Sequence, residues 1–157
     1  AMLTALYRKE VNDYPKFFKM DPLCRLGFIA TELLLKAEGE TVEGTRNDRA
    51  VVVCTRHGCY ANDCRYQQTI TDENYFPSPA VFVYTLANIV TGEIAIRHHY
   101  QGETSCFVLQ EYEAERVRQL AATAFCDHET KSVVCAWLDC RNEGEFEAVV
   151  ELMERNV

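Results

Sequence analysis

Two short, continuous apolar runs place the strongest constraint on the fold of this chain. Residues 50–54 read AVVVC and residues 132–138 read SVVCAWL. A strand that is apolar on both sides is typical of a sheet whose two faces are both covered. Segments with helical spacing of apolar residues lie before, between and after these runs. The order of elements therefore predicts an α/β domain in which helices flank a largely parallel sheet.

The first predicted helix follows Asp21. An Asp at the N-cap and Pro22 at the first helical position are a frequent pair of start signals, and Gly39 is typical of a helix end. Between these signals apolar and small residues recur at helical spacing: Leu23, Leu26, Gly27, Ala30, Leu33, Leu34 and Ala37.

The middle of the chain repeats this start signal at Ser78-Pro79. The helix that follows is expected to be interrupted near Ala87-Asn88 and to end before Gly102. Residues 105–109, SCFVL, then predict a second strand.

Three further segments are assigned from spacing. Apolar residues between Ala114 and Phe125 predict a third helix, and those between Phe146 and Met153 predict a final helix. Near the start of the chain, Leu3 to Tyr7 is compatible with a short strand, and Asn12 to Pro15 reads as a turn.

Length and charge narrow the class of protein. A chain of 157 residues suits one domain, here residues 1–157, and 48% hydrophobic residues are typical of a globular chain. The formal net charge of −8 argues against nucleic acid or an anionic membrane as the main partner. No secretory signal and no apolar stretch of about 20 residues is visible. We therefore expect a cytoplasmic protein whose eight cysteines are thiols.

Four segments together resemble β-ketoacyl synthases (3-oxoacyl-ACP synthases), which are thiolase-like condensing enzymes. Residues 76–103, FPSPAVFVYTLANIVTGEIAIRHHYQGE, resemble that family's Leu-Pro-Asn helix, with Ala87 in place of the usual Pro. Residues 19–39, 50–60 and 132–140 are similar to its early helix, its Gly-rich strand and turn, and a later strand. The resemblance implies a thiolase-like half-domain with a mostly parallel, mixed sheet flanked by helices.

The chain departs from this family where the chemistry is expected. The position of the nucleophilic Cys, at the start of the helix after the second strand, falls on Glu111, with Gln110 before it. Glu cannot carry a thioester through a condensation cycle. The family's two catalytic histidines belong to a C-terminal half that has no counterpart here, and its opening strand has no clear match in residues 2–18. The histidines of this chain do not match them: His57, His98, His99 and His128.

The resemblance therefore implies a non-condensing accessory protein of fatty-acid, polyketide or aryl-polyene-type biosynthesis, without catalytic residues or cofactor. It would form a homodimer, or a heterodimer with a ketosynthase, in which residues 105–109 pair across the interface, and it would contact an acyl carrier protein. Gln110 invites comparison with chain-length-factor subunits, in which Gln replaces the nucleophilic Cys. Gln110 and Glu111 are the expected pocket residues, although Glu111 is equally suited to a first helical turn.

The basic cluster Arg97, His98 and His99 is a second candidate binding site. On an acidic protein it suits an acidic partner such as an acyl carrier protein. A solvated helix C-terminus, where cations are favourable, explains the same cluster.

Two alternative functions remain open from the sequence. An acyl-transfer or thioester-processing enzyme would use Cys106 or Glu111 as its reactive residue, whereas apolar neighbours favour a structural role for Cys106. A metal-binding domain would use the spacing C-x2-H-x-C-x4-C, although no second Cys pair supports it and scattered thiols are the simpler interpretation. That spacing is formed by Cys54, His57, Cys59 and Cys64.

Overall fold

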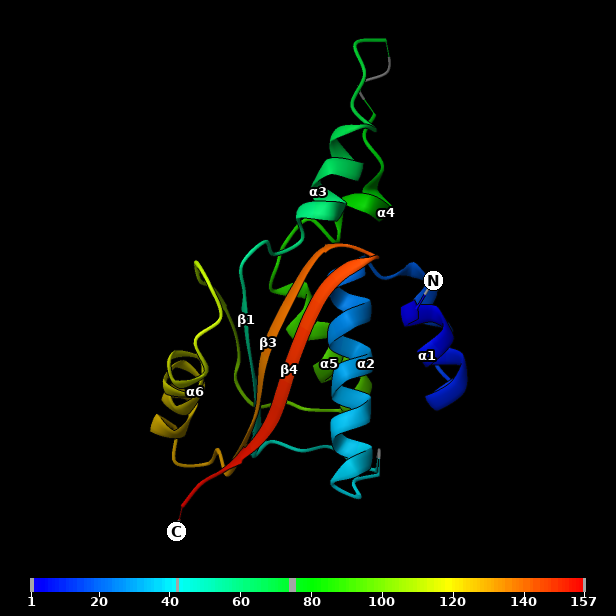
Figure 1. The fold of residues 1–157 in the computed structure, drawn as a ribbon. Coiled ribbons are helices and arrows are strands. Elements are labelled where there is room, and N and C mark those ends of the chain that lie inside the picture. Colours follow the sequence, from blue (N-terminus) through cyan, green and yellow to red (C-terminus); the bar gives the residue numbers. More distant parts are fainter. Residues whose placement is uncertain (1, 42, 74–75, 157) are drawn as a thin grey trace.

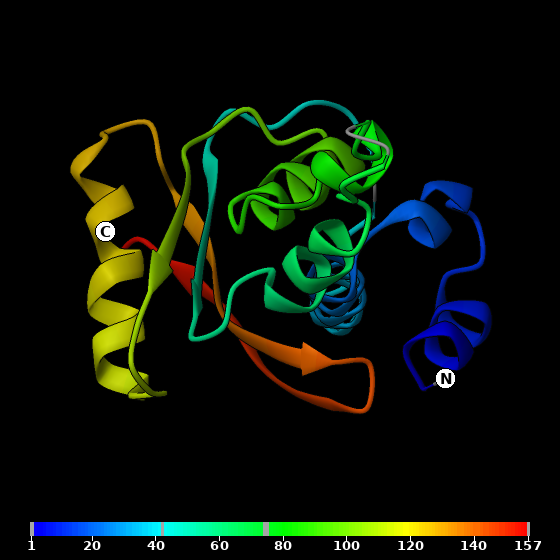
Figure 2. The ribbon, with the colours of Figure 1, turned by 90° about the horizontal axis from the view of Figure 1, so that it is seen from above.

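The computed structural model describes residues 2–41, 43–73 and 76–156. Its centre is a four-stranded sheet in the order β2-β1-β3-β4 (Figure 1). Helices α2 (Pro22–Ala37) and α5 (Ile89–His98) cover one face of this sheet and α6 (Ala114–Ala122) covers the other, as Figure 2 shows from above. The strands are β1 (Arg49–Thr55), β2 (Thr104–Val108), β3 (Ser132–Asn142) and β4 (Glu145–Glu154).

The sheet is mixed but mostly parallel, as the sequence predicted. β1 runs parallel to both of its neighbours, so that Val52 lies opposite Ser105 on β2 and Cys135 on β3. β4 runs antiparallel to β3 at the far side. Every residue of β1 is buried, which explains why this strand is apolar without alternation.

The predicted final helix is wrong, because residues 145–154 form strand β4. Phe146 and Val150 pack on the α2 side of the sheet, whereas Met153 packs on the α6 side. This alternation has the period of two residues that a strand requires. The tight turn before β4 makes the antiparallel return to β3 possible: the N–H of Gly144 donates to Asn142 Oδ1 at 2.9 Å.

The predicted strand at Leu3 to Tyr7 is also wrong, because these residues belong to α1 (Met2–Glu10). Leu3 and Tyr7 lie four residues apart, so a helix places both on one face, and both are buried. Tyr7 stacks on Phe17 of the short helix η1 (Pro15–Lys19), with ring centroids 4.2 Å apart. The predicted turn follows α1, and Asn12 adopts a left-handed conformation with φ of 55°.

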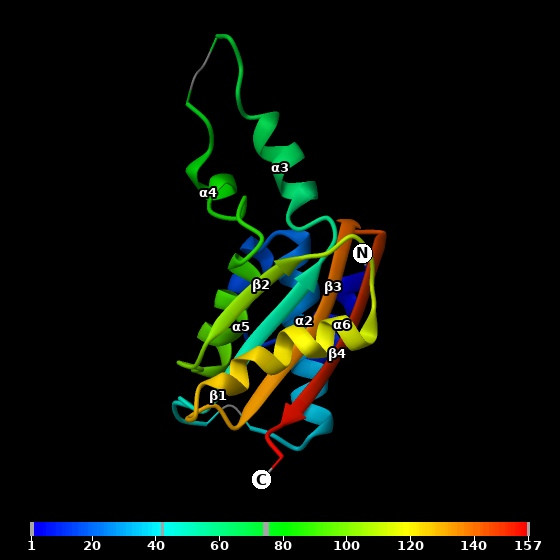
Figure 3. The same ribbon diagram turned by 90° about the vertical axis from the view of Figure 1, so that its left-hand side faces the viewer.

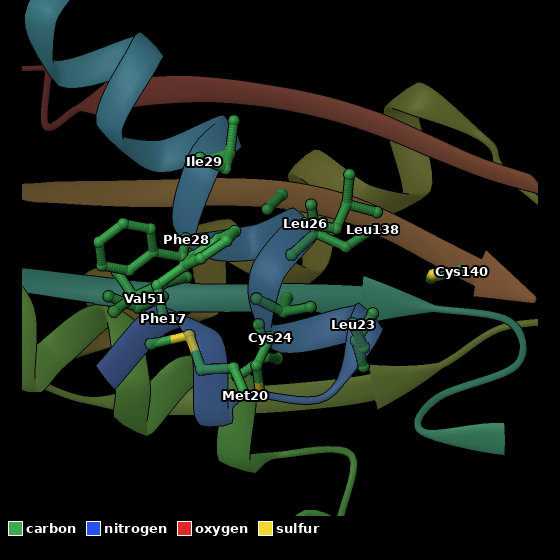
Figure 4. Packing of buried hydrophobic residues seen from close by; sticks show 14 of the residues in the cluster. Phe17, Met20, Leu23, Cys24, Leu26, Phe28, Ile29, Val51, Leu138 and Cys140 are labelled. Atoms are coloured by element: carbon green, nitrogen blue, oxygen red, sulfur yellow. The ribbon is translucent and has the colours of Figure 1, made fainter. Parts of the chain in front are cut away.

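Helix α2 (Pro22–Ala37) begins where the sequence predicted. Asp21 is the N-cap, and its Oδ1 accepts the backbone N–H of Cys24 at 3.1 Å. The buried face of α2 meets α5 (Ile89–His98) and β3 and forms the larger hydrophobic core, seen from close by in Figure 4. A smaller core lies on the opposite face of the sheet, under α6 (Ala114–Ala122).

Residues 60–73 and 76–86, which we call the arm, extend beyond one end of the sheet (Figures 1 and 3). The arm contains α3 (Tyr60–Gln67) and α4 (Pro79–Phe82). The expected interruption near Ala87-Asn88 is confirmed, because α5 begins only at Ile89. In the described part of the chain, no helix has the length and apolar character needed to cross a membrane.

Gly27 sets the close approach of α2 to its neighbours. A Cβ at this position would overlap Val90 of α5 and lie 2.9 Å from Leu138 of β3. We expect Gly27→Ala to lower the free energy of unfolding, because overpacking costs about 1–3 kcal/mol and exceeds a helix-propensity gain of about 1 kcal/mol. Urea denaturation measures the change. The matched control is Gly92→Ala in α5, where a Cβ meets nothing within 4 Å; equal effects of the two substitutions would contradict this packing.

Candidate functional site: the open edge of the sheet

Strand β2 lies at the edge of the sheet, and in the described residues no strand pairs with its outer side. Its sequence, TSCFV, contains neither a charged residue nor a proline. Proteins usually protect edge strands with charges, prolines, bulges or covering segments, because an unpaired edge invites another strand. An unprotected edge of this composition is therefore a candidate interaction site.

Hydrogen bonding to β1 determines which backbone groups of β2 face outward. Val51 N donates to Glu103 O at 2.9 Å, and Leu109 N donates to Thr55 O at 2.9 Å. Since bonding alternates along a strand, the odd-numbered residues 103–109 point their backbone groups toward β1. The N–H and C=O groups of Thr104, Cys106 and Val108 point toward the open edge.

Apolar side chains flank this edge on the α5 side. Ile96 of α5 is 58% exposed and Val108 of β2 is 68% exposed. A shallow hollow next to the strand is lined by Ile96, His99 and Thr104 among others. The edge thus combines free backbone groups with exposed apolar surface, which is the composition of a strand-pairing interface.

The predicted pocket residues lie beyond the carboxyl end of β2. Gln110 and Glu111 are both exposed in the loop that follows the strand. The prediction that Glu111 starts a helix is wrong, because α6 begins at Ala114 with Glu113 as its N-cap. Among the residues that the structure describes, no side chain forms a capping hydrogen bond here, and Glu113 is not one of the preferred N-cap residues that would have marked this start in the sequence.

The alternative reactive residue, Cys106, lies half-buried in β2. Burial raises the pKa of its thiol to about 11. The thiolate is the reactive form of Cys, so this thiol is a weak nucleophile at neutral pH.

Two of the three residues in the basic cluster at the end of α5, Arg97 and His98, contact acidic residues of the same chain. Arg97 Nε lies 2.7 Å from Glu32 Oε1, and Arg97 Nη2 lies 2.9 Å from Asp13 Oδ1. His98 is buried with its Nε2 3.1 Å from the same Glu32 oxygen. His99 ends the helix in a left-handed conformation and is exposed beside β2. Among the three residues, only His99 therefore faces the open edge.

The sequence pattern for a metal site is not assembled. Cys54 lies in the core under α6, whereas the Sγ of Cys59 donates to Asp63 Oδ1 at 3.3 Å at the start of the arm. Within residues 2–41, 43–73 and 76–156, no group of three His, Cys, Asp or Glu side chains is placed to hold a metal ion.

One polar pair that the sequence did not single out lies at the carboxyl ends of β1 and β3. His57 Nδ1 is 2.8 Å from Asp139 Oδ2. Asp139 Oδ1 also accepts the backbone N–H groups of His57, at 2.8 Å, and Arg56, at 3.1 Å. Burial by itself raises the pKa of Asp139, but the hydrogen bonds from His57 outweigh it and hold the pKa below its ordinary value. This pair fixes the turn from which the arm begins.

Comparison with solved structures places the fold in the thiolase-like class. The ishigamide ketosynthase/chain length factor matches with a TM-score of 0.68 and 19% identity, over 83% of this chain and 37% of the matched chain. The complex of the ketosynthase ApeO with its chain length factor ApeC from Xenorhabdus doucetiae matches with a TM-score of 0.65 and 16% identity. That match covers 92% of this chain and 62% of the other.

These likenesses confirm the predicted thiolase-like fold, and the chain spans less than two thirds of the length of either of these two chains. No protein-family model matches the sequence, and no curated protein matches it.

The burial of Cys106 predicts the order in which the thiols react. We expect iodoacetamide to label the exposed Cys64 and Cys126 first and Cys106 more slowly, because its raised pKa keeps the thiolate scarce. Mass spectrometry of tryptic peptides over time measures this order, with the urea-unfolded chain as the control in which all thiols are accessible. Fastest labelling at Cys106 would instead indicate an activated nucleophile.

The Asp139 contacts predict a pH-dependent loss of stability. A carboxyl whose folded pKa is lowered stabilises the fold above its unfolded pKa, about 3.9, and this contribution is lost as the pH falls through the folded pKa. Asp139→Asn should lower the free energy of unfolding at pH 7 by about 1–3 kcal/mol, because hydrogen bonds to a charged acceptor are lost.

Urea denaturation between pH 2.5 and 7 tests this prediction. The difference between wild type and Asp139→Asn should shrink at acidic pH, whereas the exposed Asp72→Asn should change little throughout. A difference that is the same at every pH would mean that the charge of Asp139 is not what holds the turn.

Proposed function

We propose that this chain is a non-condensing, ketosynthase-like accessory subunit of the chain-length-factor type. The single observation that carries the proposal is the unprotected edge strand β2 on a thiolase-like fold. The two solved structures compared above are of a ketosynthase with a chain length factor. A cytoplasmic biosynthetic pathway of the fatty-acid, polyketide or aryl-polyene type is the setting that fits this role.

The partner on the β2 edge is a ketosynthase or a second copy of this chain. Thr104, Cys106 and Val108 each offer one N–H and one C=O, so an added strand gains main-chain hydrogen bonds along the whole edge. Ile96 and Val108 supply apolar contact beside that strand. His99 lies at one end of the interface, and Gln110 and Glu111 lie at the other, where they would contact the partner.

The residues at the expected catalytic position support a role without condensation chemistry. Glu111 stands in an exposed loop, not at a helix N-terminus, so it has neither the thiol nor the helix dipole that a ketosynthase nucleophile uses. The nearby Cys106 lies within strand β2, and burial raises the pKa of its thiol. An acyl-transfer enzyme built on Cys106 is therefore the weaker candidate.

Coexpression with the ketosynthases of the source organism tests the proposal. We expect a 1:1 complex with one of them, measured by light scattering coupled to size exclusion. Thr104→Lys combined with Val108→Lys should weaken association at least about tenfold, because charges at the edge oppose strand pairing. Light scattering on the chain alone reports whether it also pairs with itself.

The matched control places two lysines on the exposed face of α6, as Gln119→Lys with Ala122→Lys. This variant should bind like the wild type. If no ketosynthase binds, the accessory role is wrong; if the edge variant binds as tightly as the control, the interface lies elsewhere.

A further inference from the structure

A groove with positively charged walls lies between η1 and the arm, away from the β2 edge. One wall is formed by residues 18–21 and 25, and the other by residues of α3, by α4 and by the segment after α4. The groove has a volume of about 510 Å³. This lies within the range of small-molecule sites, about 300–1,000 Å³. We call this feature the basic groove.

Exposed apolar side chains stand on both sides of the basic groove. Phe18 is 46% exposed on the η1 side, and Val83 is 53% exposed on the arm side. Val81 also lines the groove and is buried, and its C=O accepts the side-chain N–H of Asn62 at 2.9 Å. Because Asn62 is itself buried, this bond ties α4 to α3 and keeps the arm wall in shape.

Two cationic residues also line the basic groove. Lys19 stands on the η1 side and Arg65 on α3, and both are exposed. In the described part of the chain, no ion pair involves either residue. Arg25 also lines the groove, but its guanidinium is bound to Glu143, Phe17 O and Phe18 O.

Asp21 is the acidic residue among those that line the groove, but its carboxylate is buried and does not pair with Lys19 or Arg65. Asp21 is 5% exposed and accepts the N–H of Cys24 as a helix cap. Two cations that form no ion pair within the described residues thus line one groove of a chain whose formal net charge is −8. Against that background their placement favours an anion over a cation.

We propose that the basic groove binds an anionic amphiphile, that is, a small molecule with a phosphate or carboxylate head and a short apolar chain. The head lies between Lys19 and Arg65, and the apolar chain covers Phe18 and Val83. The volume of the groove, about 510 Å³, suits a small molecule of this kind. This inference does not depend on the proposed pairing at β2.

Titration of the ¹⁵N-labelled protein with octyl phosphate below its micelle concentration tests the inference. We expect saturable amide shifts at Phe18, Arg65 and Val83, and the same residues should respond to octanoate if a carboxylate head suffices. Octyltrimethylammonium has the same chain with the opposite charge and should bind at least about tenfold more weakly. Inorganic phosphate alone should bind weakly because it gains no apolar contact.

Charge-reversal variants locate the site. Lys19→Glu with Arg65→Glu should raise the Kd for octyl phosphate at least about tenfold, since two attractive charges become repulsive. The matched control, Arg8→Glu with Lys131→Glu, makes the same change in net charge at exposed positions outside the groove and should keep the wild-type Kd. Val83→Ser should also weaken binding, because it removes apolar contact without changing the charge of the groove.

Three outcomes would overturn the inference. The first is equal binding of the cationic and anionic amphiphiles, and the second is equal loss of binding in the groove variant and its control. The third is binding confined to an acidic amphipathic peptide or to phosphatidylglycerol vesicles, with none to soluble octyl phosphate. That last result would assign the groove to a protein segment or to a membrane surface.

Discussion

The parallel pairing of β1 with β3 is the contact on which the rest of the structure depends. β1 is buried along its whole length and contributes side chains to both hydrophobic cores. At its start, buried Arg49 donates to Ser132 Oγ of β3 and to the Tyr100 hydroxyl after α5. Arg49 also forms an ion pair with Glu40, in the segment after α2. One side chain therefore fixes the start of the sheet to the segments that follow two of its covering helices.

The opposite end of the same strand pair is held by a second polar contact. Asp139 of β3 binds the ring and backbone of His57, directly after β1. The chain leaves the sheet at this point to form the arm, so this pair sets the direction in which α3 begins. The position of the basic groove depends on where the arm begins. The open edge depends on which strands pair with β1, because β2 has β1 as its neighbour on one side.

The physical link between fold and proposed role is the position of β2. In most parallel sheets, helices cover both faces, and the strands at the edges are protected by charges, prolines, bulges or a covering segment. Here α5 and α6 cover the two faces beside β2, and within the described residues no strand pairs with the outward groups of Thr104, Cys106 and Val108. The proposed role uses this edge, whereas burial raises the pKa of the Cys106 thiol and residue 111 is a Glu.

Local signals in the sequence are enough to predict the class of fold. The apolar runs at residues 50–54 and 132–138, the Asp21-Pro22 helix start and the break before Ile89 are local signals, and each is confirmed. Residues 3–7 and 146–153 were assigned wrongly because their apolar spacing fits both helix and strand, and only packing on Phe17 or pairing with β3 decides between them. Other features join residues far apart in the chain: the ion pairs of Arg97, the pair formed by His57 and Asp139, and the groove that Lys19 and Arg65 both line. Tertiary structure alone decided these sites, because no local periodicity encodes which distant side chains meet.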